Sequence, residues 1–218
     1  MSLLFGPRKK LASLPVLDPI FIRQRTGILV IDDDPSAFPV ELFQQAGYSI
    51  TYWNKIENMQ RLCDFTYDII ILDVMGVADK FDGDGLDVLK LIKKNAPSQL
   101  IIAFSGSKSV QSKEEFWKLS DGALKKPIRF FECQQYLDDF IDKHISINTK
   151  WIKLRDELIK GRLAQKDIDR IEECIVTGIG GDASGVANIR KILSGNGLIK
   201  IDSVLSIVNS FIQIYTAK

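Results

Sequence analysis

The sequence has little of what marks a secreted, membrane-spanning or nucleic-acid-coating protein. Its three cysteines among 218 residues lack CxxC spacing, which argues against a disulfide framework or a zinc site. No apolar run approaches the roughly 20 residues of a membrane span. The short apolar stretch at 3–5 is followed by basic residues, whereas a signal peptide has them before its apolar stretch, so no signal peptide is predicted. A net charge of +1 gives no general reason to expect nucleic acid or a membrane as a partner. The simplest setting is a reducing cytoplasm.

The chain does have enough apolar residues to bury a core, since hydrophobic residues make up 45% of it. Between about Gly27 and His144, short apolar runs alternate five times with helix-length segments. This alternation predicts an α/β domain whose parallel sheet is covered on both faces. The predicted strands lie near 27–32, 48–53, 67–73, 99–105 and 121–125. The predicted helices lie near 36–46, 56–64, 84–95, 110–119 and 129–143.

The pattern divides the chain into an N-terminal extension at 1–26, the alternating domain at 27–146 and an all-α C-terminal module at 147–218. In the module, apolar residues recur three or four positions apart, which predicts three or four amphipathic helices. The extension holds three prolines and no clear period. It is either a tail or a segment that lies over the domain through its apolar residues Phe5, Leu17, Ile20 and Phe21.

Polar side chains follow four of the predicted strands: Asp32 and Asp33, then Asp73, Ser105 and Lys126. In a parallel α/β sheet the reactive groups gather at the carboxyl ends of the strands. Carboxylates crowded into one cleft need a counter-cation or a shared proton. Oxygen-only ligands suit a hard ion, and a few carboxylates completed by water suit Mg²⁺ better than zinc.

Such a cleft also suits phosphoryl chemistry. A carboxylate beside the ion can act as a nucleophile toward phosphorus and form an aspartyl phosphate. Lys126 would neutralise charge on the incoming group, and Ser105 could donate a hydrogen bond to one of its oxygens. The structural alternative makes Asp32 and Asp33 part of a turn, Asp73 a helix cap and Lys126 a solvated side chain. That all of them follow predicted strands favours the functional interpretation.

At this point the sequence resembles the receiver domain of two-component response regulators over roughly residues 27–144. The motifs are specific together, although each alone would be weak. They are ILVIDDD at 28–34, DIIILD at 68–73, DGLDVL at 84–89, AFSG at 103–106 and KKP at 125–127.

The resemblance implies a flavodoxin-like, five-stranded, doubly wound parallel sheet of order 2-1-3-4-5. It makes Asp73 the phosphoacceptor, and it assigns Mg²⁺ to Asp32, Asp33 and Asp73 with the backbone carbonyl of Met75. Ser105 and Lys126 would bind the phosphoryl group. The donor would be a phosphohistidine on a sensor histidine kinase or a phosphotransfer protein. The protein would then be a signalling acceptor and not an enzyme.

Three departures from the family pattern stand out. Family members place an aromatic residue at the switch position three residues before the lysine, where this chain has Ala123, so the usual output route is predicted to be lost or replaced. The loop at 78–83 is about four residues longer than is usual. Apolar Met75 stands two residues after the phosphoacceptor, where it cannot position water, which predicts slow self-dephosphorylation.

The C-terminal module is predicted to contact protein and not DNA. Residues 148–218 hold eleven basic and eight acidic residues, and the candidate recognition helix at 183–193 carries only Arg190 and Lys191 as charged residues. Output would pass to an unknown downstream protein target, or the chain would act as a phosphoryl sink or relay, with a homodimer as a further possibility. The alternatives are a DNA-binding transcription regulator with an atypical helical effector domain and a receiver that works without phosphorylation.

Overall fold

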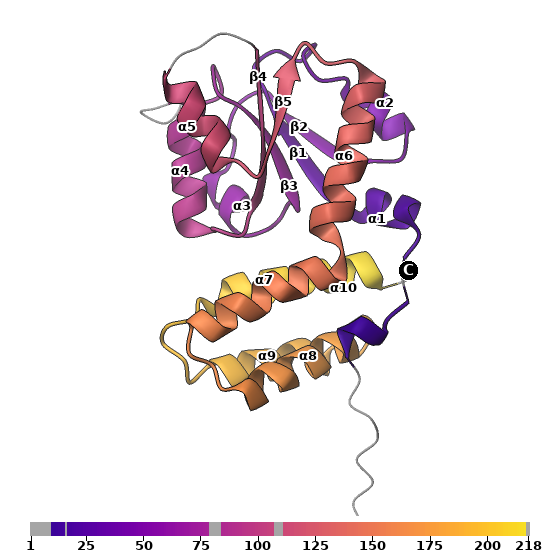
Figure 1. The fold of residues 1–218 in the computed structure, drawn as a ribbon, viewed down its shortest axis with the longest axis vertical. Coiled ribbons are helices and arrows are strands. Elements are labelled where there is room, and N and C mark those ends of the chain that lie inside the picture. Colours follow the sequence, from indigo (N-terminus) through magenta and orange to yellow (C-terminus); the bar gives the residue numbers. More distant parts are fainter. Residues whose placement is uncertain (1–9, 16, 79–83, 107–110, 217–218) are drawn as a thin grey trace, which may run out of the picture. The chain divides into compact units, whose positions relative to one another are not determined.

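The computed structural model describes residues 10–15, 17–78, 84–106 and 111–216, without the side chains of 111–113. The chain divides into two compact units (Figure 1). One is Pro19–Ile145, the sheet unit, and the other joins Ser146–Lys218 to the N-terminal segment Met1–Asp18, the helical unit. Among the described residues, no helix is both long enough and apolar enough to cross a membrane.

The sheet unit is built on five parallel strands in the order β2-β1-β3-β4-β5. The three central strands are almost entirely buried, because they are continuous apolar runs covered on both faces. The outer strands β2 and β5 alternate between buried and exposed residues. This confirms the predicted doubly wound sheet of order 2-1-3-4-5. The strands are β1 (Gly27–Ile31), β2 (Ser49–Trp53), β3 (Ile69–Asp73), β4 (Leu100–Gly106) and β5 (Gly122–Lys126).

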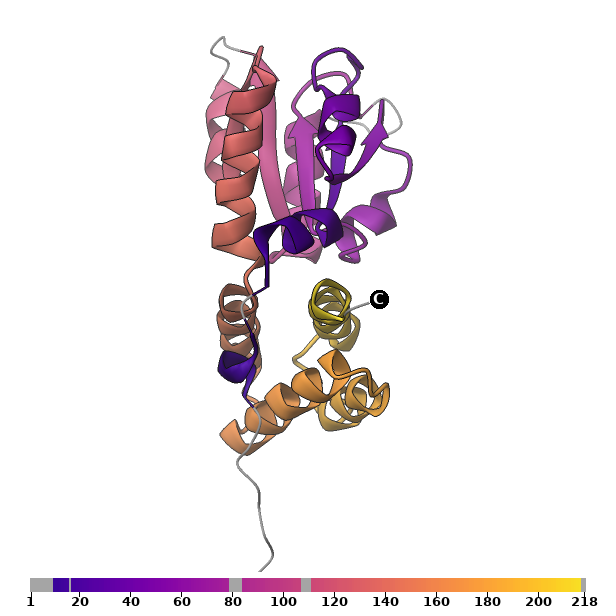
Figure 2. The ribbon, with the colours of Figure 1, turned by 90° about the vertical axis from the view of Figure 1, so that its right-hand side faces the viewer.

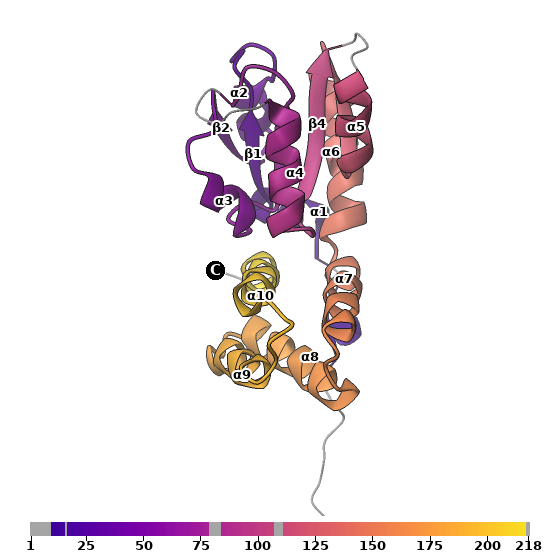
Figure 3. The ribbon, with the colours of Figure 1, turned by 90° about the vertical axis from the view of Figure 1, so that its left-hand side faces the viewer.

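Six helices belong to the described part of this unit. Helices α3, α4 and α5 cover one face of the sheet (Figure 3), and α2 and α6 cover the other (Figure 2). Apolar residues of α3, α4 and α5 pack with inward-facing strand residues in one buried cluster. The helices are α1 (Pro19–Arg25), α2 (Val40–Gln45), α3 (Met59–Cys63), α4 (Gly85–Asn95), α5 (Gln111–Leu119) and α6 (Phe130–Ile145).

Helix α2 begins four residues later than the sequence pattern predicts. The Asp34 carboxylate accepts hydrogen bonds from the Ser36 N–H (2.9 Å) and hydroxyl (2.6 Å), which forms a turn in place of the first helical turn. Pro39 then occupies the N-cap position, and a proline disfavours helical geometry in the residue before it. A loop therefore separates the end of β1 from α2.

Helix α3 also starts later than predicted, at Met59. The main-chain N–H of Ile56 donates to the carbonyl of Val77 (3.0 Å), so this segment bonds to the loop after β3. Asn58 then caps the helix by accepting from the N–H groups of Gln60 (2.9 Å) and Arg61 (3.2 Å). The cap fixes the start that hydrophobic periodicity alone did not locate.

The predicted N-terminal extension is divided between the two units. Helix α1 belongs to the sheet unit, where the guanidinium of Arg23 binds both carboxylate oxygens of Asp138 at 3.1 and 2.7 Å. Ile20 and Phe21 are 55% and 51% exposed, so each of these two side chains is only partly covered. Leu17 is half-buried, and Phe5 lies outside the described residues.

The helical unit contains four α-helices among its described residues, within the predicted three or four. They surround an apolar core in which the side chain of Leu11, from the N-terminal segment, is buried among residues of the C-terminal helices. The main-chain N–H of Leu11 donates to the carboxylate of Glu172 at 3.1 Å. The helices are α7 (Ile147–Lys160), α8 (Gln165–Ile179), α9 (Ser184–Leu193) and α10 (Ile201–Tyr215), and residues Leu11–Ser13 form a short 3-10 helix.

Candidate functional site

The polar residues singled out in the sequence lie along the carboxyl edge of the sheet, at the upper end of the strands in Figure 1. Asp32 directly follows β1, Asp73 ends β3, and Lys126 ends β5. In the register of the sheet, Asp73 lies opposite Phe104, the residue before Ser105. The order of the parallel strands thus brings residues separated by up to 94 positions to one edge.

The Lys126 ammonium bridges two of the carboxylates. Its Nζ lies 2.6 Å from Asp32 Oδ2 and 2.8 Å from Asp73 Oδ2. Burial acts to lower the pKa of Lys126, but the hydrogen bonds and charges of Asp32 and Asp73 outweigh it and raise the pKa. The lysine therefore carries its positive charge. Its side chain is only 19% exposed and contacts two carboxylates, which rules out the solvated lysine of the structural alternative.

Asp32 is the most deeply placed acid of the site, with no exposed surface. Its Oδ1 accepts a hydrogen bond from the N–H of Asp34 at 3.0 Å. Burial raises the pKa of Asp32, and the hydrogen bonds from Lys126 and Asp34 only partly oppose this effect. The raised pKa indicates a negative charge that its surroundings do not fully compensate.

Asp33 completes the cluster from an exposed position. One carboxylate oxygen from each of Asp32, Asp33 and Asp73 lies within 4.8 Å of the others. The Asp33 carboxylate lies against Gly76, which has a φ of +73°, and a Cβ at that glycine would come within 2.1 Å of Asp33 Oδ2. The missing side chain at position 76 therefore makes room for the carboxylate.

The three carboxylates fit a divalent cation. Against the ammonium of Lys126 they leave two negative charges unbalanced, which a doubly charged ion would neutralise. Oxygen donors and an exposed side with access to water suit Mg²⁺, which keeps several water ligands.

The main chain around Asp73 is tightly packed. Asp73 Oδ1 accepts from the N–H of Val74 at 2.7 Å, and the N–H of Gly85 donates to the carbonyl of Val74 at 2.9 Å. A Cβ at Gly85 would lie 2.3 Å from the carbonyl oxygen of Asp73. The start of α4, capped by Asp84, thus rests directly on the end of the strand that carries Asp73.

The remaining predicted residues lie nearby in different settings. Ser105 is buried at the end of β4, and the side chain of Met75, two residues beyond Asp73, is 58% exposed. Ala123 is exposed on β5, and its main-chain N–H donates to the hydroxyl of Tyr136 from α6 at 2.8 Å. The long loop singled out in the sequence lies outside the described residues over 79–83.

Two aromatic residues of the site were not singled out in the sequence. The Lys126 Nζ lies 4.9 Å from the centre of the buried Phe104 ring, a cation–π contact that helps hold the ammonium. The Tyr52 hydroxyl donates a hydrogen bond to the main-chain carbonyl of Asp32. Their positions in the sequence could have indicated them, because Tyr52 lies near the end of the second strand and Phe104 directly precedes Ser105.

Comparisons of the whole sequence with family models and with curated proteins give no match. No family model matches the chain. No curated protein matches it either.

Solved structures that match include receiver domains of response regulators that cover about half of this chain. A CheY-like receiver domain protein from Methanospirillum hungatei is 17% identical, with a TM-score of 0.47, over 54% of this chain and 94% of its own. A chemotaxis protein from Vibrio cholerae is 22% identical, with a TM-score of 0.41, over 52% and 97%. A two-component response regulator from Clostridium difficile is 22% identical, with a TM-score of 0.44, over 56% and 99%.

Proposed function

We propose that the chain is a two-component response regulator whose sheet unit accepts a phosphoryl group on Asp73. The donor is a phosphohistidine on a sensor histidine kinase or a phosphotransfer protein. Asp32, Asp33 and Asp73, with the backbone carbonyl of Met75, would hold Mg²⁺. The observation that carries this proposal is the convergence of three carboxylates with the Lys126 ammonium at the carboxyl edge of the sheet.

In the transfer, one oxygen of the Asp73 carboxylate attacks phosphorus as the bond to the donor nitrogen breaks, and the imidazole leaves with the electron pair. A bound Mg²⁺ would neutralise the oxygens of the transferred group. The chain's own residues do the positioning. The Lys126 ammonium, which lies 2.8 Å from Asp73, would form an ion pair with one phosphoryl oxygen. The Ser105 hydroxyl would donate a hydrogen bond to another phosphoryl oxygen.

This role is that of an acceptor and not of an enzyme that turns over a substrate. The geometry supports Asp73 as the attacking group more strongly than Asp32. Asp32 has no exposed surface, so an incoming phosphoryl donor cannot reach its carboxylate directly. Asp73 keeps 5% of its surface exposed and ends its strand at the open edge of the sheet.

The test is labelling of the purified chain by acetyl phosphate, with and without Mg²⁺, read as a mass increase of one phosphoryl group. We expect one labelled site, loss of labelling in Asp73→Asn, and loss in the wild type after chelation of Mg²⁺. Asp142→Asn, at an exposed position on α6, is the matched control and should label normally. Labelling that persists in Asp73→Asn would contradict the proposal.

For the helical unit we propose output through protein contact. Helix α9 corresponds to the segment considered above as a recognition helix. Its Arg190 lies 3.4 Å from Asp202. Its Gly185 packs so closely on α8 that a Cβ there would lie 2.3 Å from the carbonyl of Cys174. A helix whose basic side chain faces an acid and whose start packs on its neighbour is poorly suited to a DNA groove. A gel-shift with genomic DNA fragments that responds to phosphorylation would favour the DNA-binding alternative.

A further inference from the structure

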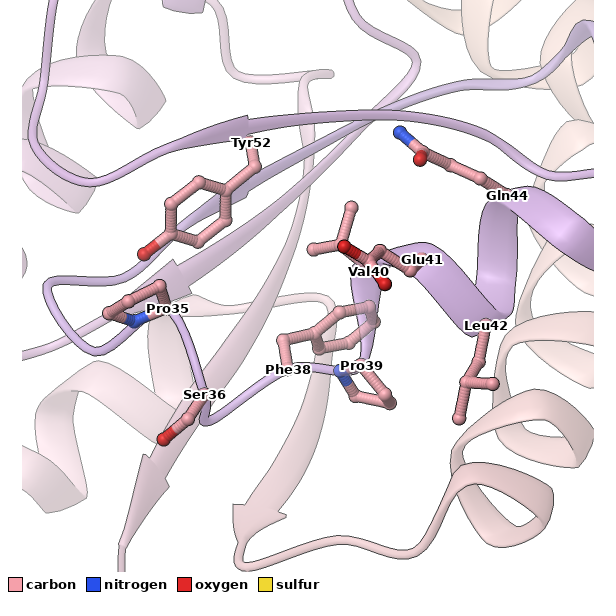
Figure 4. Close-up of a pocket in the computed structure, with 9 residues that line it drawn as sticks. All are labelled: Pro35, Ser36, Phe38, Pro39, Val40, Glu41, Leu42, Gln44 and Tyr52. Carbon is pink, nitrogen blue, oxygen red and sulfur yellow. The ribbon is translucent and has the colours of Figure 1, made fainter.

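Tyr52 joins the acidic cluster to a surface pocket. It lies on β2 opposite Val30 of β1, and its hydroxyl donates to the main-chain carbonyl of Asp32. Its ring is half-buried and forms one wall of a pocket of about 510 Å³ (Figure 4). The other walls come from the loop after β1 and from α2, including Pro35 and Val40. The loop that delays α2 is therefore what leaves the ring accessible.

The main chain of Asp32 is held by β2 through both of its polar groups. Its N–H donates to the carbonyl of Trp53 at 3.1 Å, and its carbonyl accepts from Tyr52. The carbonyl of Asp32 and the N–H of Asp33 belong to one planar peptide unit. A hydrogen bond that fixes this carbonyl therefore fixes the plane from which the next residue projects.

Asp33 depends on that plane more than the other two acids do. The side chains of Asp32 and Asp73 are buried and bound by Lys126. The carboxylate of Asp33 is exposed and lies against the main chain of Gly76. Its direction is set mainly by its own backbone.

Resting on the magnesium site proposed above, we infer that the Tyr52 hydroxyl is a positioning group for Asp33 and sets the affinity of the cluster for Mg²⁺. An ordinary phenol is protonated at neutral pH, so the hydroxyl is a hydrogen-bond donor there. Outer partners of this kind, which touch a ligand and not the ion, commonly change metal affinity about 10- to 100-fold when they are removed.

The test is calorimetric titration of the full chain with Mg²⁺, comparing wild type with Tyr52→Phe. The variant keeps the ring and its packing and removes only the hydroxyl. We expect the dissociation constant to rise about tenfold while the thermal midpoint without metal stays the same. Tyr67→Phe is the matched control, because its ring is buried edge-on against Trp53 (centroids 5.8 Å apart) in the apolar cluster that α3, α4 and α5 form with the sheet, on the opposite face from Tyr52. It should bind Mg²⁺ as the wild type does.

A second variant identifies the route. If Tyr52 acts through Asp33, then Tyr52→Phe should not weaken metal binding further in an Asp33→Asn background. Binding of Mn²⁺, measured by electron paramagnetic resonance, gives the affinity in this background. Equal affinity of Tyr52→Phe and wild type, or additive losses in the double variant, would overturn the inference. Wild-type protein that binds Mg²⁺ while Tyr52→Phe is unchanged would leave the proposed function intact. Wild-type protein that does not bind Mg²⁺ would remove both.

Discussion

Replacing Lys126 by methionine tests whether the acidic cluster is held together by one buried ammonium. Methionine keeps an unbranched apolar stem over the Phe104 ring and removes the charge. The side chains of Asp32 and Asp73 are 0% and 7% exposed, so the variant leaves two buried carboxylates without their common partner. Breaking a buried ion pair by removing one member costs about 3–5 kcal/mol. We expect the free energy of unfolding of the sheet unit to fall by about that amount.

The loss should depend on pH with a definite sign. Burial already raises the pKa of Asp32, and removal of the ammonium should raise it further. A carboxyl group with a raised folded-state pKa binds its proton more tightly in the folded chain. Its favourable contribution is present at low pH and is lost as the pH rises through the folded-state pKa. The deficit of Lys126→Met should therefore be largest at about pH 8 and shrink toward about pH 5.

Urea unfolding followed by tryptophan fluorescence measures this deficit. A Trp151→Phe background leaves Trp53 and Trp117, both in the sheet unit, as the reporters. Lys125→Met is the matched control, because Lys125 is the exposed neighbour on the same strand, and it should change stability by less than about 0.5 kcal/mol. A deficit equal to that of the control, or one that is the same at both pH values, would refute the reasoning.

Four further outcomes follow from the packing and from the site. Gly85→Ala should destabilise the sheet unit by about 1–3 kcal/mol, because its Cβ would lie 2.3 Å from the carbonyl of Asp73. Gly195→Ala is the control and should not destabilise the chain, because the space around Gly195 is open. Equal unfolding midpoints of the two variants would contradict this prediction. Burial raises the pKa of the Cys133 thiol to about 12, so alkylation near neutral pH should modify the other two, half-buried cysteines first, as read by peptide mass spectrometry. Because that pKa lies above its ordinary value, the thiol's contribution to stability should be kept up to about pH 9 and decline at higher pH. Finally, if Asp73 is phosphorylated as proposed, the nearby apolar Met75 should slow hydrolysis, and a phosphoryl half-life of only seconds in purified protein would exclude this.

The sheet and the convergence of the acidic residues at its carboxyl edge were predictable because both follow from local runs of residues. Continuous apolar stretches such as Ile69–Leu72 can be satisfied only by burial on both faces, and parallel strands bring their carboxyl ends to one edge. Asp32, Asp73 and Lys126 were therefore placed by topology before any distance was known. The distances confirm that placement, and the roles of these residues remain predictions.

Features that depend on local turns, or on contacts between distant segments, could not be predicted from hydrophobic runs in this way. The late start of α2 depends on the Asp34 turn, which competes with the helix for the same backbone groups. The burial of Leu11 depends on helices more than 130 residues away. In the sequence Tyr52 is an ordinary aromatic residue of a predicted strand, and only the fold shows that its hydroxyl binds the main-chain carbonyl of Asp32.

The hydrogen bond between Ala123 and Tyr136 has a consequence for self-association. Edge strands present unpaired backbone groups that can template a strand from another molecule, which is a common start of aggregation. On β5 the outward N–H of Ala123 is occupied by a hydroxyl from α6, and on β2 the carbonyl of Ile50 accepts from the amide of Gln44 on α2 at 3.1 Å. A strand arriving at either rim would first have to displace a side chain anchored on a packed helix. At these two positions the side chains of Tyr136 and Gln44 therefore oppose edge-to-edge pairing of the sheet.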